Sequence, residues 1–179
     1  MRTPIISGLV LLGWLGLPLP WIAQAQNTHQ DPQGRFAIDL PPGFKLTSEQ
    51  LGRIFVFQGD DAQLFVSAVA GSSDLDRLWR FALDDFTGPG VPAPPAESVS
   101  DLEVNGNPAR LAWYTFDPGS DGTRAPYTAL LGAVVLRASG TGVVCFAVLN
   151  EKAAGRWGEP LRGALRSIRI PGPPVIGAT

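Results

Sequence analysis

Two apolar runs near the end of the chain limit most strongly what this sequence can fold into. Residues 127–138 and 143–149 are rich in hydrophobic side chains at successive positions, and the turn residues 139–142 separate them. Successive side chains of a strand point to opposite faces of a sheet. In the first run one face carries Leu130, Val134 and Leu136, and the other carries Leu131, Ala133 and Val135. Such strands must be covered on both faces.

Two segments have the helical period that suits these covers. In residues 73–86 apolar side chains recur every three to four positions, with charged residues on the opposite face. Ser73 is the expected N-cap, and Gly88-Pro89-Gly90 ends the helix. A second helix is expected at the C-terminus, with Pro160 in its first turns, where proline is tolerated. The apolar stripes are Leu75, Leu78, Trp79, Ala82, Leu83 and Phe86, and Trp157, Leu161, Leu165 and Ile168.

Turn residues divide the rest of the chain into short strands. Runs rich in β-branched and aromatic residues occupy 35–40, 53–58, 63–70, 99–104 and 109–116. Asn105-Gly106-Asn107 is a strong hairpin signal, and short hairpin links make neighbouring strands antiparallel. The sequence therefore predicts an α+β fold, with an antiparallel sheet of about six to seven strands and one helix on each face. In this three-layer α-β-α sandwich, Trp79 and Trp157 anchor the two helices and Trp113 lies on a central strand.

The first 25 residues have the pattern of a signal peptide. Arg2 is followed by an apolar run and by Ala23-Gln24-Ala25, a small-residue cleavage site. We expect cleavage near Ala25 and export to the periplasm, the extracellular space or the thylakoid lumen. The alternative is an uncleaved anchor, because the uncharged stretch 3–30 is long enough to span a bilayer. Pro18, Pro20 and the cleavage pattern favour removal, so the mature chain is not expected to span a membrane.

The remaining chain reads as one domain with loose ends. We expect a flexible leader at 26–34, a single globular domain at 35–170 and a disordered tail at 171–179. The 14 Lys and Arg residues and 16 Asp and Glu residues are scattered, with a net charge of −2. This balance argues against nucleic acid binding, which needs clustered basic residues. Cys145, the only cysteine, lies within an apolar run and is expected to be a buried core residue.

The sequence carries little catalytic chemistry. His29 is the only histidine and lies in the leader, so a Ser-His-Asp triad or an imidazole metal site has no base within the fold. A carboxylate hydrolase remains a hypothesis, yet the candidate aspartates lie on turns or side by side on a helix. Residues 117–122 faintly resemble a calcium loop, but Thr128 stands where glutamate is required. We expect no catalytic residue, no cofactor and no metal. The candidate aspartates are Asp60 with Asp61, Asp84 with Asp85, and Asp117 with Asp121.

Three motifs and the order of elements resemble one known family. The motifs are GRFAIDLPPGF at 34–44, VNGNPA at 104–109 and LRSIRI at 165–170. They look like the PsbP/DcrB-type α-β-α sandwich of exported bacterial and photosynthetic-lumen domains, over about residues 34–170. The resemblance implies a small non-enzymatic accessory or binding domain. Photosynthetic members help retain calcium and chloride at a membrane complex, but this sequence has no matching histidine or acidic ligand set.

These observations favour an exported, non-enzymatic accessory domain that docks on a membrane or periplasmic assembly through an unknown protein partner. Arg110, Tyr114 and Phe116 share one face of the 109–116 strand and are the candidate partner contacts if that face is exposed. The alternative is that helices cover both faces of this strand. A second hypothesis is a small-ligand-binding protein whose proline- and glycine-rich segment 87–97 acts as a lid.

Overall fold

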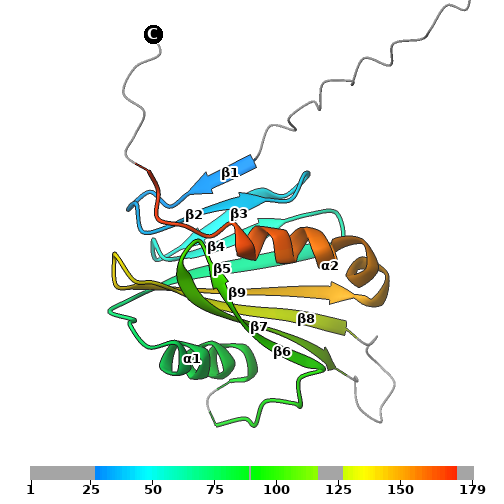
Figure 1. Ribbon diagram of the computed structural model, residues 1–179. Helices are drawn as coiled ribbons and strands as arrows, with labels where there is room; N and C mark the ends of the chain where they lie inside the picture. Colours follow the sequence, from blue (N-terminus) through cyan, green and yellow to red (C-terminus); the bar gives the residue numbers. More distant parts are fainter. Residues whose placement is uncertain (1–26, 89, 117–126, 173–179) are drawn as a thin grey trace, which may run out of the picture.

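The computed structural model describes residues 27–88, 90–116 and 127–172, and its centre is a seven-stranded antiparallel sheet (Figure 1). The strand order is β3-β4-β5-β9-β8-β7-β6. These strands are β3 (Lys45–Gln50), β4 (Ile54–Gln58), β5 (Ala62–Ala70), β6 (Ser98–Val104), β7 (Asn107–Phe116), β8 (Tyr127–Leu136) and β9 (Thr141–Asn150). A separate antiparallel pair consists of β1 (Asn27–Gln30) and β2 (Ala37–Leu40), and the helices are α1 (Leu75–Thr87) and α2 (Glu151–Arg166). The predicted α+β sandwich is confirmed.

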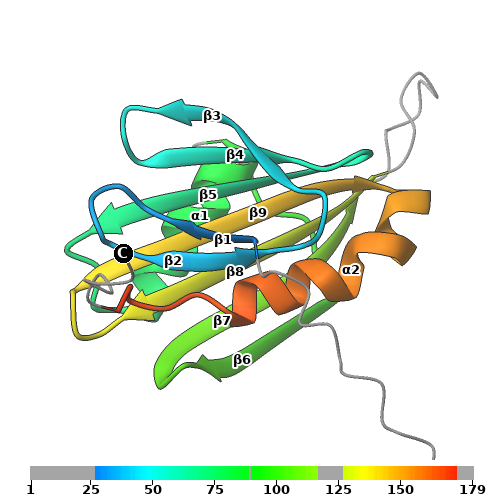
Figure 2. The ribbon, with the colours of Figure 1, turned by 90° about the horizontal axis from the view of Figure 1, so that it is seen from above.

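The two faces of the sheet are covered differently. Helix α2 and the β1–β2 pair lie on one face, and α1 lies on the other (Figures 1 and 2). Helix α2 contacts β2, β8 and β9, whereas α1 contacts β7, β8 and β9. On the α2 side, β1 and β2 extend the cover, since His29 and Phe36 pack against Phe55 of β4. Among the described residues, the main contacts of α1 are with β7, β8 and β9, and on β5 its core meets Val69.

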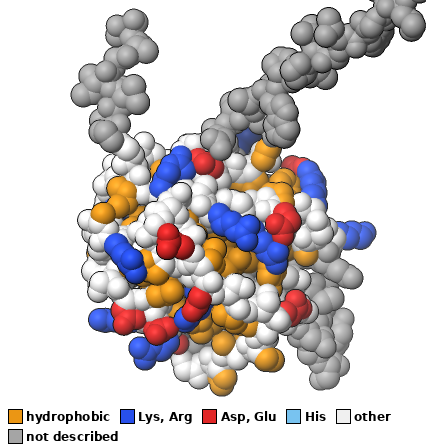
Figure 3. Space-filling model, viewed as in Figure 1, with side chains coloured by type: hydrophobic (Ala, Val, Ile, Leu, Met, Phe, Trp, Pro, Cys, Tyr) orange, Lys and Arg blue, Asp and Glu red, His pale blue; other side chains and the backbone are white. Residues whose placement is uncertain are grey.

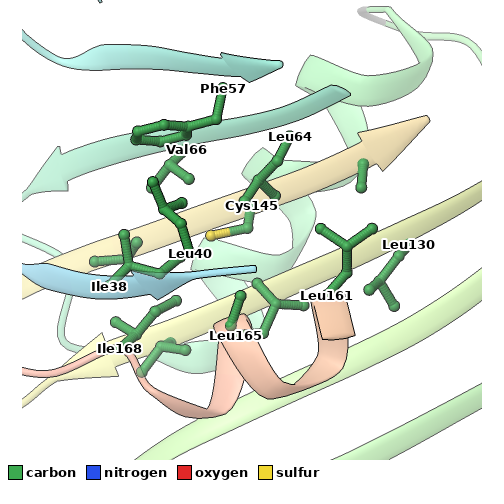
Figure 4. Close-up of a cluster of buried hydrophobic side chains, with 14 of the residues drawn as sticks. Ile38, Leu40, Phe57, Leu64, Val66, Leu130, Cys145, Leu161, Leu165 and Ile168 are labelled. Atoms are coloured by element: carbon green, nitrogen blue, oxygen red, sulfur yellow. The ribbon is translucent and has the colours of Figure 1, made fainter. Parts of the chain in front are cut away.

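Each face of the sheet has its own hydrophobic core. Leu130, Val134 and Leu136 belong to the core under α2, and Leu131, Ala133 and Val135 belong to the core under α1. The predicted division of this strand is therefore confirmed. Cys145 lies in the first core, among residues of the sheet, β2 and α2 (Figure 4). Burial in this apolar setting raises the pKa of its thiol well above the ordinary value.

The starts of both helices differ from the sequence prediction. The N-cap of α1 is Asp74 rather than Ser73, because the extended backbone of Asp74 lets its carboxylate accept the Arg77 N–H at 2.9 Å. Helix α2 begins directly after β9, where the Asn150 side chain caps it by accepting the Ala153 N–H at 2.8 Å. Pro160 therefore lies inside the helix, not in its first turns. It is on the exposed side, where water solvates the carbonyl that loses its donor.

Two strands were missed because they are polar. The prediction of a flexible leader is wrong for Asn27–Gln30, which pairs with β2. Side chains hold this strand in place: Asn27 donates to the Phe44 carbonyl at 2.6 Å, and Thr28 donates to Asp39 at 2.6 Å. Strand β3, with sequence KLTSEQ, carries one large apolar residue and shows no hydrophobic alternation. Backbone pairing, which leaves no signature in the sequence, places both strands.

Trp79, Trp113 and Trp157 are all buried as predicted, although Trp113 lies on β7, next to the β6 edge of the sheet, rather than at its centre. The predicted signal peptide, the turn around Asp117–Asp121 and residues 173–179 of the tail lie outside the described residues. Among the described residues, no helix is long and apolar enough to cross a membrane. On the surface shown in Figure 3, acidic, basic and apolar side chains are interspersed.

Candidate functional site

On the α1 side of the sheet, strands β4 and β5 carry side chains that are only partly covered. Strand alternation directs Leu64, Val66 and Ala68 of β5 into the core under α2. The alternate residues Phe65, Ser67 and Val69 therefore face the α1 side, where they are only half-buried. Ile54 of β4 pairs with Ser67 and lies on the same side. The result is a groove between α1 and strands β4 and β5.

Two adjoining hollows give this groove its shape. The larger has a volume of about 550 Å³, and the smaller, of about 140 Å³, shares Val69, Ala70 and Phe81 with it. We call this surface the α1 groove. Its floor is formed by Ile54, Ser67 and Val69, its helical wall by Arg77, Phe81 and Asp85, and its far rim by Arg35 and Arg53.

Phe81 is the main apolar group of the wall. It lies on the flank of α1, away from the buried stripe that contains Leu78, Trp79 and Ala82. Its side chain is left at the mouth of the hollow, and the residue is 45% exposed. Single exposed apolar residues are common, but Phe81 also lines both hollows of the groove.

The arginines of the groove differ in how they are engaged. Arg35 forms a two-pronged ion pair with the buried Asp31, with Nε–Oδ2 and Nη2–Oδ1 distances both of 2.7 Å. Burial alone would raise the pKa of the Asp31 carboxyl, but hydrogen bonds from Arg35 outweigh it and hold the pKa below its ordinary value. Arg53 and Arg77 form no ion pair with any carboxylate in the part of the chain that the structure describes. Asp85 is the one carboxylate among the lining residues.

Aromatic side chains continue this surface beyond the groove. Phe65 of β5 and Phe146 of β9 stack with their ring centroids 4.3 Å apart and an interplanar angle of 10°. Phe86, in the last turn of α1, lies 6.1 Å from Phe146 and 5.8 Å from Tyr114. A separate hollow of about 330 Å³ lies beside Phe86 and is bordered by the segment 87–97. Its lining residues are Phe86, Thr87, Val91, Pro92, Pro94 and Tyr127.

Of the partner contacts predicted from the sequence, Arg110 and Tyr114 are not exposed. Tyr114 is buried under α1, and burial raises the pKa of its hydroxyl. Arg110 is mostly buried, and it contacts Asp76 of α1 at 2.9 Å and Asp101 of β6 at 2.5 Å. The side chain of Phe116 lies outside the described residues. Helix α1 thus covers this face of β7, as the alternative expected.

Sequence reasoning missed Phe81, Arg53 and Arg77. Phe81 did leave a signal, because it is the one phenylalanine of the helix that falls outside the apolar stripe of residues 75–86. Arg53 and Arg77 left none, since scattered arginines are ordinary on a soluble domain. Their proximity to one hollow depends on the packing of α1 against the sheet.

The two aspartate pairs within the described residues do not build a shared site. Asp60 forms an ion pair with Arg156 at 3.3 Å, and Asp61 accepts a hydrogen bond from Trp157 Nε1 at 2.5 Å. Asp85 lines the α1 groove, whereas its neighbour Asp84 does not. Asp117 and Asp121 lie outside the described residues. Within the described ranges, no group of three or more His, Cys, Asp or Glu residues is arranged to hold a metal ion.

Comparison with known proteins identifies the fold. No protein-family model and no curated protein sequence matches the chain. Among solved structures, the cyanobacterial PsbP (CyanoP) of Synechocystis is similar, with a TM-score of 0.59 and 16% identity over 89% of this chain and 100% of that one. The Ran-binding protein Mog1p of Saccharomyces cerevisiae has a TM-score of 0.58 and 15% identity, over 81% of this chain and 95% of its own.

LpqN of Mycobacterium tuberculosis, which is involved in cell envelope biogenesis, has a TM-score of 0.54 and 12% identity, over 84% of this chain and 88% of its own. At such identities the likeness shows the fold alone. The chain has the PsbP/Mog1/DcrB-like fold, and the resemblance seen in the sequence is confirmed at that level.

Proposed function

We propose that this chain is an exported, non-enzymatic accessory domain that binds a protein partner at the α1 groove. The observation that carries the proposal is the half-exposed Phe81 beside an open hollow, on the part of the sheet that α1 leaves uncovered. Covering a phenylalanine contributes about 1–2 kcal/mol when it is already half-buried. A partner that fills the groove would cover this side chain, which stays half-exposed in the isolated domain.

The chemistry of the groove suits binding better than catalysis. Its lining residues include one carboxylate and neither histidine nor cysteine. Hydrolysis by a pair of carboxylates, as in most glycosidases, uses two such groups facing one substrate. The lining instead combines arginines with apolar side chains, the residue types that are common at protein interfaces.

The structural neighbours support a binding role without assigning it. One of them is described as a Ran-binding protein and another as involved in cell envelope biogenesis. The signal-peptide pattern of residues 1–25 supports a partner outside the cytoplasm, on a membrane or periplasmic assembly. Amino-terminal sequencing of the protein from its host tests export: a start near Gln26 supports it, and an unprocessed Met1 contradicts it.

Photo-crosslinking in the native compartment tests the partner and the surface together. Phe81 is replaced by p-benzoylphenylalanine, which keeps an aromatic ring in the groove. The control carries the same group at Glu159, an exposed position of α2 on the other side of the sheet. We expect one specific protein adduct from position 81 and none from position 159. Equal adducts from both positions, or none from position 81, would contradict the proposal.

A second candidate is the binding of a small apolar ligand beside the segment 87–97. The hollow of about 330 Å³ next to Phe86 favours it, since ligand pockets usually measure about 300–1,000 Å³. The Thr87 hydroxyl donates to the Val91 carbonyl at 3.0 Å and holds the segment near the hollow. Thermal shift with a panel of apolar compounds tests this role. A compound that binds this hollow should raise the melting temperature of the wild type but not that of Val91→Asp, because the aspartate places a charge in the lining.

A further inference from the structure

We infer that the occupant of the α1 groove is an acidic segment of the partner protein that carries a large apolar side chain. This inference rests on the proposed function and adds the chemistry of the partner. It follows from two features of the groove. One is the pair of arginines, on the far rim and on the helical wall, that form no ion pair within the described residues, and the other is the apolar surface between them.

The charge of the groove favours an acidic partner. Three arginines line the two hollows, against a single aspartate. The charge of Arg35 is balanced by Asp31, so Arg53 and Arg77 are the cations available to a ligand. Arg53 lies on the rim beside the β3–β4 turn, and Arg77 lies on the first turn of α1 across the groove. Carboxylates of a bound segment would meet a guanidinium group on either side.

The apolar part of the groove specifies the rest of the ligand. Phe81 forms the wall between the two hollows, because it lines both of them. Ile54 and Val69 lie on the floor beside it. A purely anionic ligand would leave these apolar side chains exposed. It would also be repelled by the Asp85 carboxylate. A segment that alternates acidic and large apolar residues satisfies both the arginines and the phenylalanine.

The test uses the purified protein and three fluorescein-labelled ten-residue peptides. The first has a central phenylalanine with two glutamates on each side, and glycine and serine elsewhere. The second replaces the glutamates by lysines, and the third replaces the phenylalanine by serine. We expect fluorescence anisotropy to show binding of the first peptide about tenfold tighter than either control peptide. Its affinity should fall several-fold between 50 and 300 mM salt, because salt screens exposed charges.

Matched variants locate the binding on the protein. Arg53→Glu with Arg77→Glu should weaken the first peptide about tenfold or more, whereas Arg53→Lys with Arg77→Lys retains most of the affinity. Lys152→Glu with Arg166→Glu makes the same change of net charge at exposed positions of α2 and should leave binding unchanged. Thermal melts of all variants confirm folding. Equal binding of the lysine peptide, or full binding by the glutamate variant, would overturn the inference.

Lipid is the other source of negative charge at a membrane. Vesicles of phosphatidylcholine with and without phosphatidylglycerol are therefore titrated in parallel. Binding to the anionic vesicles that is lost in the glutamate variant, together with no binding of the peptides, would overturn the inference in favour of headgroups. If the crosslink from position 81 persists but no arginine dependence is found, the proposed function stands and this inference fails. If that crosslink is absent, the proposed function itself fails.

Discussion

Gly142 of β9 lies directly against Leu78 of α1: a Cβ atom built on the glycine would be 2.6 Å from the leucine Cδ1. The same atom would be 2.8 Å from Ser72 Cβ, just before the helix. Real Cβ atoms do not approach other carbons so closely, so α1 rests on the sheet at a point where only glycine fits. The position of the α1 groove depends on this contact, because the helix forms its wall.

We expect Gly142→Ala to lower the free energy of unfolding by about 1–3 kcal/mol, because the added methyl group forces α1 away from the sheet. Urea denaturation followed by tryptophan fluorescence measures the change. Gly155→Ala is the matched control, since this glycine lies within α2 with open space around its Cα. It should stabilise the protein by about 0.5–1 kcal/mol through helix propensity. An unchanged stability of Gly142→Ala would show that α1 is not held as the structure has it.

Arg110 joins α1 to the edge strand β6. Its guanidinium contacts Asp76 and Asp101 and lies 5.8 Å from the centre of the Trp79 ring. Both aspartates are well exposed, so the ion pairs contribute little on their own. We expect Arg110→Ala to cost about 1–2 kcal/mol, chiefly through lost packing on Trp79, and Arg110→Lys to cost less. Arg80→Ala, on the exposed side of α1, should change stability by less than about 0.5 kcal/mol.

His29 makes the stability of the protein depend on pH. Its ring lies 4.9 Å from both Phe55 and Phe57, and Nε2 is buried without a hydrogen-bond partner among the described residues. Burial lowers the pKa of His29 from the ordinary 6.5, although Asp31 and Glu49 partly offset it. The unfolded chain therefore binds the proton first as the pH falls. The contribution to stability is complete above pH 6.5 and is lost progressively below that value.

Urea denaturation between pH 5 and 8 measures this effect. His29→Phe removes the only histidine while keeping an aromatic ring against Phe55 and Phe57. We expect the fall in stability between pH 6.5 and the lowered pKa to disappear in this variant. If the free energy of unfolding of the wild type instead rises as the pH decreases through this range, His29 is stabilised in its charged form.

In the β3–β4 turn, Leu51 adopts a positive φ angle, a backbone conformation that favours asparagine or glycine. Leu51 and Gly52 have φ angles of 53° and 63°, and the Arg53 N–H donates to the Gln50 carbonyl at 3.1 Å. The Asn105-Gly106 turn has the same backbone signs, with φ angles of 50° and 77°. Leu51 is also 82% exposed, so it gains little from packing. We expect Leu51→Asn to raise the free energy of unfolding by about 0.5–1 kcal/mol.

The reverse change tests the same reasoning. Asn105→Leu should destabilise the protein more than Leu51→Asn stabilises it, because the Asn105 side chain also donates to the Ile168 carbonyl at 2.9 Å. Both effects are read from urea denaturation midpoints. A destabilised Leu51→Asn would indicate that the leucine makes contacts that its exposure does not suggest.

Within the described ranges, seven of the nine strands and both helices were predictable because their side chains carry a regular pattern. The strand at 127–136 is the clearest example, since its two apolar faces required covers on both sides and predicted the sandwich. Strands β1 and β3 were not predictable, because polar side chains without alternation leave backbone pairing invisible in the sequence. The start of α2 was misplaced because Pro160 was taken as a marker of the first turns, whereas Asn150 caps the helix directly after β9, ten positions earlier.

The candidate site shows the same limit more strongly. Tyr114 and Arg110 share a strand face in the sequence, but α1 covers that face and buries the tyrosine. Phe81 was visible only as an off-stripe residue of a helix, and Arg53 had no distinguishing neighbour in the sequence. These two residues are 28 positions apart in the sequence. They line one hollow only because α1 packs beside β4 and β5.

Hydrophobic periodicity by itself determined the class of fold, since each apolar face demands a cover and turn residues divide the strands between them. The composition fixed the supply of two reactive residue types, since His29 is the only histidine and Cys145 the only cysteine. Only the tertiary structure decided which half of the sheet stays open. Helix α1 is too narrow to cover seven strands, and its contact at Gly142 leaves Ile54 of β4 and Ser67 of β5 only partly buried beside Phe81.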